Sequence, residues 1–330
     1  MPSSITFPLQ KPNGRYTWAL DLARAQANAG HDVHIFAGQD STDTSSIHWQ
    51  SRPPTSNHPL ENNSALMASA LIDTSFDIYH SHFDNLQYSL GYLTNKPIVF
   101  TQHWWPYEQT VTAASRYPNT NIWAAPPTRF MYDFDTQNNI QSQGHIYHGI
   151  DLSLFHHEPV PKSERLLFVG RISPEKNLAL CIEIAKESGI GLDIIGKITP
   201  KNMSYWESLL PSIDGNQIIY HGAKTRSELI RYYSAARAVL FPTDTHEAFG
   251  LVTIEAQACG TPVITGRGGS RNELIDAGVT GFLCESITEY IDAIHASTHI
   301  RTDACRKFAE KFDIRFMVDA YESLYESLVG

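Results

Sequence analysis

The stretch THEAFGLVTIEAQACGTPVI (residues 245–264) places two carboxylates, Glu247 and Glu255, on either side of a Phe-Gly-Leu turn. The apolar run RAVLFPT (237–243) before it predicts a buried strand, and residues 250–259 are rich in helix formers. A second apolar run, TPVITG, follows the helix. A strand, a helix and another apolar strand in this order are typical of a parallel sheet whose crossover connections are helices.

The turn at Gly250 is suited to binding a phosphate group. A helix that begins near Gly250 leaves its first backbone amides without intrahelical acceptors, and the glycine lets a ligand approach the backbone closely. Glu255 would lie in the first two turns of this helix and could accept hydrogen bonds from a ribose, while Glu247 could hold another polyol. A second interpretation is that both acids only complement the helix dipole on a solvated surface.

A second motif, FVGRISPEKN (168–177), supplies two cations at a strand-to-helix turn. Arg171 follows a buried strand and offers a fork of donors, and Lys176 provides a point charge as the next helix opens. Two ordinary exposed cations are the alternative interpretation. Together the two motifs describe a diphosphate flanked by two polyols, which is the chemistry of a nucleotide-sugar.

Strands and helices alternate along the whole chain. The pattern predicts strands at residues 3–9, 31–38, 77–82, 96–103, 165–171, 191–197, 216–222, 237–243 and 261–266, and helices at 15–29, 176–188, 225–236, 250–259 and 314–329. Residues 104–145 are aromatic-rich and give no clear assignment. Two alternating series, joined near residues 148–164, predict two doubly wound Rossmann-like domains whose ligands bind at the carboxyl ends of the strands.

Size and composition restrict the class of protein further. A chain of 330 residues is longer than one hydrophobic core usually serves, so two domains are expected. The net charge of −10 argues against nucleic acid as a partner, and the front half lacks the basic excess of a membrane-docking surface. No apolar run is long enough to span a bilayer, no signal-peptide pattern stands at the start, and the four cysteines have no metal or disulfide spacing. We expect a cytoplasmic protein with buried free thiols.

Several segments resemble the signature segments of the retaining glycosyltransferase family 4. In the back half these are FVGRISPEKN, HEAFGLVTIEAQACGTPVI, GVTGFL (278–283) and IYHGIDLSLF (146–155). In the front half, LARAQANAGHDVHIFAG, DIYHSH and PIVFTQH are similar to the family's first helix and the strands that follow it. The resemblance covers nearly the whole chain, and its back-half motifs are the more specific.

This resemblance implies an α/β protein with the GT-B fold, in which two Rossmann-like doubly wound domains face a cleft. The implied domains are an N-terminal acceptor domain over residues 1–155 and a C-terminal nucleotide-sugar donor domain over 156–312. Residues 313–330 would form a closing helix that returns towards the N-terminal domain.

The resemblance also implies roles for individual residues. Glu247 matches a glutamate that holds donor-sugar hydroxyls, and Glu255 matches one that binds the nucleotide ribose. Arg171 and Lys176 match the cationic pair on the diphosphate, and His103 matches a histidine near the donor sugar and the acceptor. The residues that match segments around the donor sugar and phosphate are Gly14, Phe249, Gly250 and Leu251.

The chain departs from the family pattern at a few positions. Asn13 replaces one of the paired glycines in the first loop, and His148 stands where asparagine is common. The segment GRGGSRNE has one more residue before Glu273 than the commonest pattern, and the front domain is short. The pair His80 and His82 in HSH is typical of a strand end, with a metal site as the alternative. The segment HWWPYEQ (103–109) is either a sugar-stacking platform or a hydrophobic lining.

The implied activity is transfer of a sugar from a nucleotide diphosphate donor to an acceptor hydroxyl, with retention of anomeric configuration. A uridine donor is expected from family frequency, and no metal is required because two cations and a helix end can stabilise the leaving group. One alternative is a nucleotide-sugar-binding regulator or inactive transferase subunit, which the altered first loop and the short front domain favour. An epimerase or a phosphorylase on the same two-domain plan is another. A dinucleotide-dependent oxidoreductase is disfavoured because GxGxxG is absent after the first strand.

Overall fold

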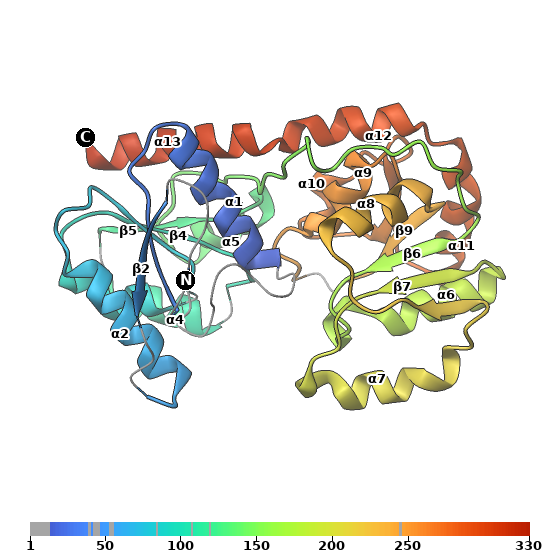
Figure 1. Cartoon of the computed structure of the whole chain (residues 1–330), viewed down its shortest axis with the longest axis horizontal. Helices are drawn as coiled ribbons and strands as arrows, with labels where there is room; N and C mark the ends of the chain where they lie inside the picture. Colours follow the sequence, from blue (N-terminus) through green and yellow to red (C-terminus); the bar gives the residue numbers. More distant parts are fainter. Residues whose placement is uncertain are drawn as a thin grey trace. The chain divides into compact units, whose positions relative to one another are not determined.

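The computed structural model describes residues 14–38, 41, 47–52, 56–83, 85–106, 108–118, 120–243 and 246–330. These residues form two compact units (Figure 1). Unit 1 comprises the chain up to Gly149 together with Ile314–Gly330, and unit 2 comprises Ile150–Asp313. The first division therefore falls after Gly149, where the sequence analysis placed it after residue 155. The strand expected over residues 3–9 lies outside the described residues.

Unit 2 contains one parallel sheet of six strands with the order β11-β10-β9-β6-β7-β8. The strands are β6 (Leu166–Val169), β7 (Leu192–Ile195), β8 (Ile218–Tyr220), β9 (Ala238–Phe241), β10 (Val263–Gly266) and β11 (Gly281–Cys284). Numbered within the unit, this is the order 3-2-1-4-5-6 of a doubly wound nucleotide-binding fold, which reverses direction between β6 and β9. Both strands at the reversal are buried at every position, because helices cover both faces of the sheet.

Helices lie on both faces of this sheet (Figure 1). They are α6 (Leu178–Ser188), α7 (Met203–Leu209), α8 (Arg226–Ala235), α9 (Leu251–Ala258), α10 (Arg271–Leu274), α11 (Ile287–Ala296) and α12 (Thr302–Ala309). Short 3-10 helices are η2 (Pro174–Lys176), η3 (Pro200–Asn202), η4 (Leu210–Ser212), η5 (Ser297–His299) and η6 (Glu310–Phe312). Helices α6 and α11 contact each other on one face, and α8, α9 and α12 pack together on the other.

Unit 1 has two parallel sheets among its described residues. The strands β1 (His34–Gly38) and β2 (His48–Arg52) form one sheet, and β3 (Tyr79–Ser81), β4 (Ile98–Thr101) and β5 (Ile122–Ala125) form the other. The helices are α1 (Gly14–Asn28), α2 (Pro59–Leu71), α3 (Leu86–Leu90), η1 (Gly91–Leu93), α4 (Glu108–Arg116), α5 (Arg129–Gln137) and α13 (Ile314–Val329). Helix α13, at the end of the chain, packs against α1.

The predicted fold class, α/β with two Rossmann-like parallel-sheet units, is confirmed. The helix expected over residues 176–188 is wrong at its start, since α6 begins at Leu178 and Lys176 ends the short helix η2. Asn177 separates them because it adopts a left-handed conformation with φ of 51°, which asparagine tolerates better than most residues. The unassigned residues 104–145 contain α4, β5 and α5. The sequence analysis also missed the strands β2 and β11 and the helices α2, α3, α7, α10, α11 and α12.

A buried carboxyl group makes the stability of unit 1 depend on pH. Asp135 in α5 is fully buried, and its Oδ1 accepts a hydrogen bond of 3.1 Å from Nε2 of Gln102. Burial raises the pKa of Asp135 to about 7, although the Gln102 hydrogen bond acts in the opposite direction. The folded protein therefore keeps this proton up to about pH 7, whereas an unfolded aspartate loses it near its ordinary value of 3.8. The free energy of unfolding must fall as pH rises between these values.

We expect Asp135→Asn to raise the melting temperature at pH 8 relative to the wild type, and to raise it much less at pH 5. The asparagine is neutral at both pH values, so the penalty for ionising a buried group disappears only where the wild type is charged. Thermal unfolding followed by circular dichroism at the two pH values measures this difference. Asp133→Asn is the matched control, because Asp133 is exposed on the same helix. Equal shifts at both pH values would contradict the prediction.

Candidate functional site

The Phe-Gly-Leu turn of unit 2 is held in one conformation from several sides. Gly250 caps the start of α9 with a φ of +94°, and a Cβ at this position would lie 2.8 Å from the Phe241 ring. Ser270 Oγ donates to the backbone oxygen of Glu247 at 2.7 Å and is 3.4 Å from that of Phe249. The glycine is therefore required both by backbone conformation and by space. Ser270 was missed by sequence reasoning, although it lies in the segment GRGGSRNE that stood out there.

Lys176 and Glu247, which belong to the two separate motifs, meet in the structure. Nζ of Lys176 donates a short hydrogen bond to Oε2 of Glu247, across 71 positions of sequence. The side chains are only 15% and 19% exposed, and Nζ also lies 5.3 Å from the centroid of the Phe241 ring. The carboxylate and the aromatic face both attract the ammonium group. Because an ammonium group has three donors, Lys176 can keep this partner and still bind an anion.

Arg171 follows β6, as the sequence predicted, and it pairs with an acid that sequence reasoning overlooked. Nη2 of Arg171 donates to Oε1 of Glu175 at 2.7 Å, and both side chains are partly exposed to solvent. An exposed ion pair of this kind contributes little to stability, so exchanging its carboxylate for a phosphate oxygen costs little. The signal was present in the sequence, since Glu175 is four positions after Arg171.

Glu255 lies in the second turn of α9 and is bonded to a buried tyrosine. Its Oε2 accepts a hydrogen bond of 2.9 Å from the hydroxyl of Tyr233. Burial, together with the negative charge of Glu255, raises the pKa of Tyr233 far above its usual value, so the phenol remains a donor. The hydrogen bond from Tyr233 thereby orients the carboxylate of Glu255. No sequence motif marks Tyr233, because the pairing depends on how α8 and α9 pack together.

His103 belongs to a group of packed aromatic side chains in unit 1. It follows β4, and its Nε2 shares a hydrogen bond of 3.1 Å with Nδ1 of His82. The Trp18 ring from α1 meets the His103 ring edge-on at 5.0 Å, and the His148 ring lies 5.6 Å from it. Gly14, the other predicted residue of unit 1, is the first residue of α1, and a Cβ there would meet no atom within 4 Å.

Burial keeps these histidines neutral. It lowers the pKa of His103 and of His82 far below the ordinary value, and it lowers the pKa of His148 to about 3. The neighbouring imidazoles add to the effect at His103 and His82. At neutral pH, His103 can therefore donate or accept a hydrogen bond, but it does not carry a positive charge to a substrate.

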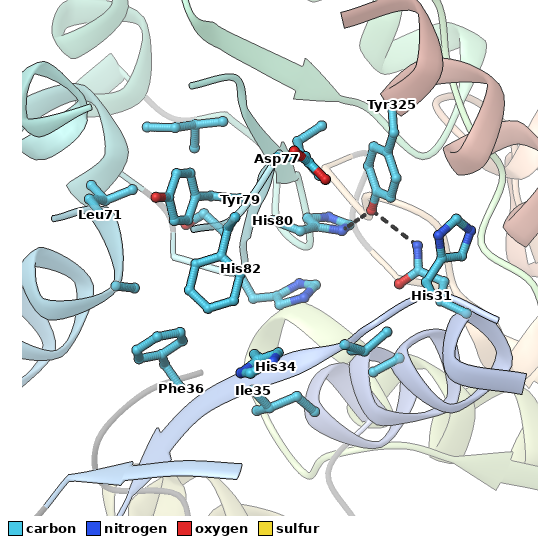
Figure 2. A pocket seen from close by; sticks show the side chains of 18 of the residues that line it. His31, His34, Ile35, Phe36, Leu71, Asp77, Tyr79, His80, His82 and Tyr325 are labelled. Carbon is cyan, nitrogen blue, oxygen red and sulfur yellow. Dashed lines mark hydrogen bonds between the residues drawn. The ribbon is translucent and has the colours of Figure 1, made fainter. Parts of the chain in front are cut away.

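His80 is part of a hydrogen-bond chain that ties helix α13 to the strands of unit 1. The Tyr325 hydroxyl lies 2.6 Å from Nδ1 of His80, as Figure 2 shows. Nε2 of His80 lies 2.7 Å from the hydroxyl of Thr101, which in turn lies 2.7 Å from that of Tyr321. The HSH segment is thus an end-of-strand pair with structural partners. Where the chain is described, no metal-binding group of three acidic, cysteine or histidine side chains includes it.

A cavity of about 680 Å³ lies within unit 1 between β1 and β3 (Figure 2). Residues of α1, α2 and the end of α13 complete its lining. The labelled side chains around it include the apolar or aromatic residues Ile35, Phe36, Leu71 and Tyr79, and they also include several histidines and Asp77. In the segment HWWPYEQ, Trp105 packs against Phe130 and Phe134 of α5. This contact agrees with the interpretation of Trp105 as part of a hydrophobic lining.

The structure distributes the predicted site residues between the two units. Unit 2 holds Arg171, Lys176, Glu247, Phe249, Gly250, Leu251 and Glu255, whereas Gly14 and His103 belong to unit 1. In unit 2 these residues follow the carboxyl ends of β6 and β9, the two strands at the reversal of the strand order. That is the place where doubly wound folds bind their ligands.

All four cysteines are free and buried. Among the helices that the structure describes, none is both long and apolar enough to cross a membrane. Of the departures noted in the sequence, His148 packs against the Trp18 ring at 4.4 Å, and Asn13 lies outside the described residues.

Two family models match the chain. The model described as glycosyl transferases group 1 matches residues 151–311, and the model described as glycosyltransferase family 4 matches residues 12–135. A relative from Klebsiella pneumoniae, described as an uncharacterized 41.2 kDa protein in the cps region, is 31% identical over 172 residues. That match covers 49% of this chain and 46% of the relative, so the chain spans about half the length of that protein.

Other comparisons cover more of the chain. The D-inositol 3-phosphate glycosyltransferase of Pseudarthrobacter chlorophenolicus is 24% identical over 364 residues, which is 88% of this chain and 84% of that protein. The crystal structure of the Anabaena protein HepE in complex with UDP-glucose superposes with a TM-score of 0.78 at 18% identity, covering 96% of this chain and 97% of HepE. The chain therefore belongs to the glycosyl transferases group 1, the retaining glycosyltransferase family 4, and has the GT-B fold.

Proposed function

We propose that this protein transfers a sugar from a UDP-sugar to an acceptor hydroxyl, with retention and without a divalent metal. The observation that carries the proposal is the contact between Lys176 and Glu247 beside the start of α9, because it joins the cation that we assign to the diphosphate and the acid that we assign to the sugar. Family membership supports it, and HepE has been crystallised with UDP-glucose. The unit 2 residues would hold the donor, while unit 1 would hold the acceptor.

The residues of unit 2 would divide the donor between them. Glu255 would accept hydrogen bonds from the ribose hydroxyls, and its orientation by Tyr233 favours that role. Lys176 and Arg171 would contact the diphosphate, together with the first amides of α9 at Gly250 and Leu251. Glu247 would hold the hydroxyls of the transferred sugar, next to the backbone at Phe249.

The chemistry follows from where charge develops. As the bond between the anomeric carbon and the diphosphate breaks, negative charge builds on the departing phosphate, where two cations and a helix end stabilise it. The sugar passes through an oxocarbenium-like state, and the acceptor oxygen attacks from the face that the phosphate leaves. The departing phosphate takes the acceptor proton, so no protein carboxylate needs to act as a base. Neutral His103 and Gly14, the first residue of α1, would contribute to binding of the sugar and the acceptor.

Thermal stabilisation by a panel of nucleoside diphosphates tests the donor site. Saturation at about 100 times the dissociation constant adds about 2.7 kcal/mol to the free energy of unfolding, so UDP is expected to raise the melting temperature clearly. Glu255→Gln should lose most of this shift with UDP, because it removes the charged acceptor for the ribose while leaving an oxygen for Tyr233. With 2′,3′-dideoxy-UDP, which lacks those hydroxyls, the wild type and Glu255→Gln should respond alike.

Glu187→Gln, an exposed acid of α6, is the matched control and should behave as the wild type. If another nucleoside diphosphate raises the melting temperature and UDP does not, the donor carries the base of that diphosphate and not uracil. The absence of a shift with any diphosphate would refute the donor-site assignment. The UDP-sugar that binds is then tested for slow hydrolysis, which separates a transferase from a protein that only binds nucleotide-sugars.

A further inference from the structure

Three side chains that the transfer reaction does not use converge at one end of the small sheet of unit 1. His34 is the first residue of β1 and His48 is the first residue of β2, and the two are directly paired in the parallel ladder. Their imidazole rings are stacked, with centroids 4.7 Å apart and planes inclined by 26°. Asp32 stands two residues before His34, just ahead of the first paired residue of β1.

The nitrogens of both rings face the same carboxylate oxygen. Nε2 of His34 lies 3.2 Å from Oδ1 of Asp32, and Nε2 of His48 lies 3.3 Å from it. Each residue offers one such atom, and the three atoms lie within 4.8 Å of one another. A zinc ion held by nitrogen and oxygen at about 2.0–2.1 Å in tetrahedral geometry separates its ligands by about 3.3 Å. Two of the three separations therefore already match those of a metal site.

We propose that Asp32, His34 and His48 form a binding site for one divalent transition-metal ion of the zinc class. Two imidazole nitrogens and one carboxylate oxygen favour Zn²⁺, Ni²⁺, Co²⁺ or Cu²⁺ over Mg²⁺ and Ca²⁺, which prefer ligand sets made of oxygen. The Asp32 and His48 side chains are 76% and 61% exposed, so an ion can reach the site from solvent and complete its coordination with water.

Neighbouring side chains support the orientation that a ligand histidine needs. The Phe76 ring meets the His34 ring edge-on at 5.0 Å, and the amide nitrogen of Gln50 lies 3.4 Å from Nδ1 of His34. Metal binding at Nε2 places the ring proton on Nδ1, which then needs an acceptor. A rotation of the Gln50 amide by half a turn presents its oxygen to that proton. Figure 2 shows His34 beside Ile35 at the cavity.

The position of the site argues for a structural role. His34 and His48 begin their strands, whereas the proposed donor-binding residues follow the carboxyl ends of strands in unit 2. A bound ion would link β2 to β1 and leave the metal-independent transfer step unchanged. The inference does not depend on the proposed function, because binding of the ion can be measured without any sugar donor.

Calorimetric titration with ZnCl₂ tests the site on protein that carries no affinity tag and has been freed of metal with a chelator. We expect one Zn²⁺ per chain with a dissociation constant in the micromolar range. His34→Ala and His48→Ala should each weaken binding by about tenfold or more. Asp32→Asn should weaken it as well, since the amide keeps the shape of the side chain and loses its charge. Co²⁺ provides a second readout, because a low-symmetry nitrogen-bearing site gives visible absorption that the histidine variants should lose.

His299→Ala is the matched control, because His299 is an exposed histidine of unit 2, and it should bind Zn²⁺ as the wild type does. His48 is exposed, so His48→Ala is expected to fold, which far-ultraviolet circular dichroism checks. The proposal is overturned if Zn²⁺ does not bind at micromolar concentrations. It is also overturned if both histidine variants bind the ion as tightly as the wild type.

Discussion

Replacing Lys176 with alanine is expected to lower kcat/KM for sugar transfer by about 10²–10³-fold, which is the usual loss when one preorganised electrostatic partner of the transition state is removed. The change removes the cation that would stabilise the departing diphosphate. It also leaves the largely covered carboxylate of Glu247 without its partner, close to where the diphosphate would bind. Steady-state kinetics with the donor found by thermal stabilisation measures the effect, using hydrolysis in place of transfer until the acceptor is known.

Binding measurements distinguish the loss of the Lys176 charge from a wider change in the structure of the donor site. Calorimetry should show that Lys176→Ala greatly weakens the binding of a nucleoside diphosphate and hardly changes the binding of the matching nucleoside. The double variant Lys176→Ala/Glu247→Gln should recover part of the diphosphate affinity, because it removes the unpaired negative charge. Lys186→Ala is the matched control, since Lys186 is exposed on α6 and donates a hydrogen bond of 2.9 Å to Oγ of Ser212. A Lys176→Ala variant within threefold of wild-type activity would show that this lysine does not contact the diphosphate.

Gly196→Ala is expected to destabilise unit 2 by about 3 kcal/mol, the upper part of the range for overpacking a well-packed interior. A Cβ on Gly196 would lie 1.8 Å from the backbone oxygen of Gly170 and 3.0 Å from Cδ1 of Ile172. The nearest atom belongs to the backbone, so the strain can be relieved only by separating the segments that follow β6 and β7. Because Arg171 comes next after Gly170, donor binding should weaken together with stability.

Thermal and urea unfolding measure this change, and diphosphate titration measures its effect on the site. Gly266→Ala is the matched control in the same sheet, because its Cβ would come no closer than 3.4 Å to another group, the hydroxyl of Tyr290. We expect that control to change stability by less than about 1 kcal/mol. An unfolding midpoint for Gly196→Ala equal to that of Gly266→Ala would show that the loop after β6 can move without cost.

Parts of this fold could be predicted because local pattern and tertiary environment agree. β6 and β9 are buried at every position, so they appear in the sequence as continuous apolar runs. The helix that follows Thr225 carries a complete capping box with Glu228, which marks its start without reference to the rest of the chain. Such elements are set by short-range chemistry.

Other elements could not be predicted because nothing local distinguishes them. β2 has the sequence HWQSR, whose polar residues suit a loop as well as a strand, and it becomes a strand through its ladder with β1. Asn177 interrupts the expected helix at residues 176–188 by one backbone conformation that many neighbours would not adopt. The formation of β2 and the break at Asn177 depend on strand pairing and packing with residues that lie far away in the sequence, so a short stretch of sequence does not predict them.

The α/β class, the motif residues and their order along the chain can be predicted from apolar runs, caps and motif spacing, because these are local properties. The contact of Lys176 with Glu247 and that of Tyr233 with Glu255 depend on the fold. The fold also brings His34 and His48 to Asp32, through the pairing of two strands. These contacts join segments that meet only when strands pair and helices pack upon the sheet.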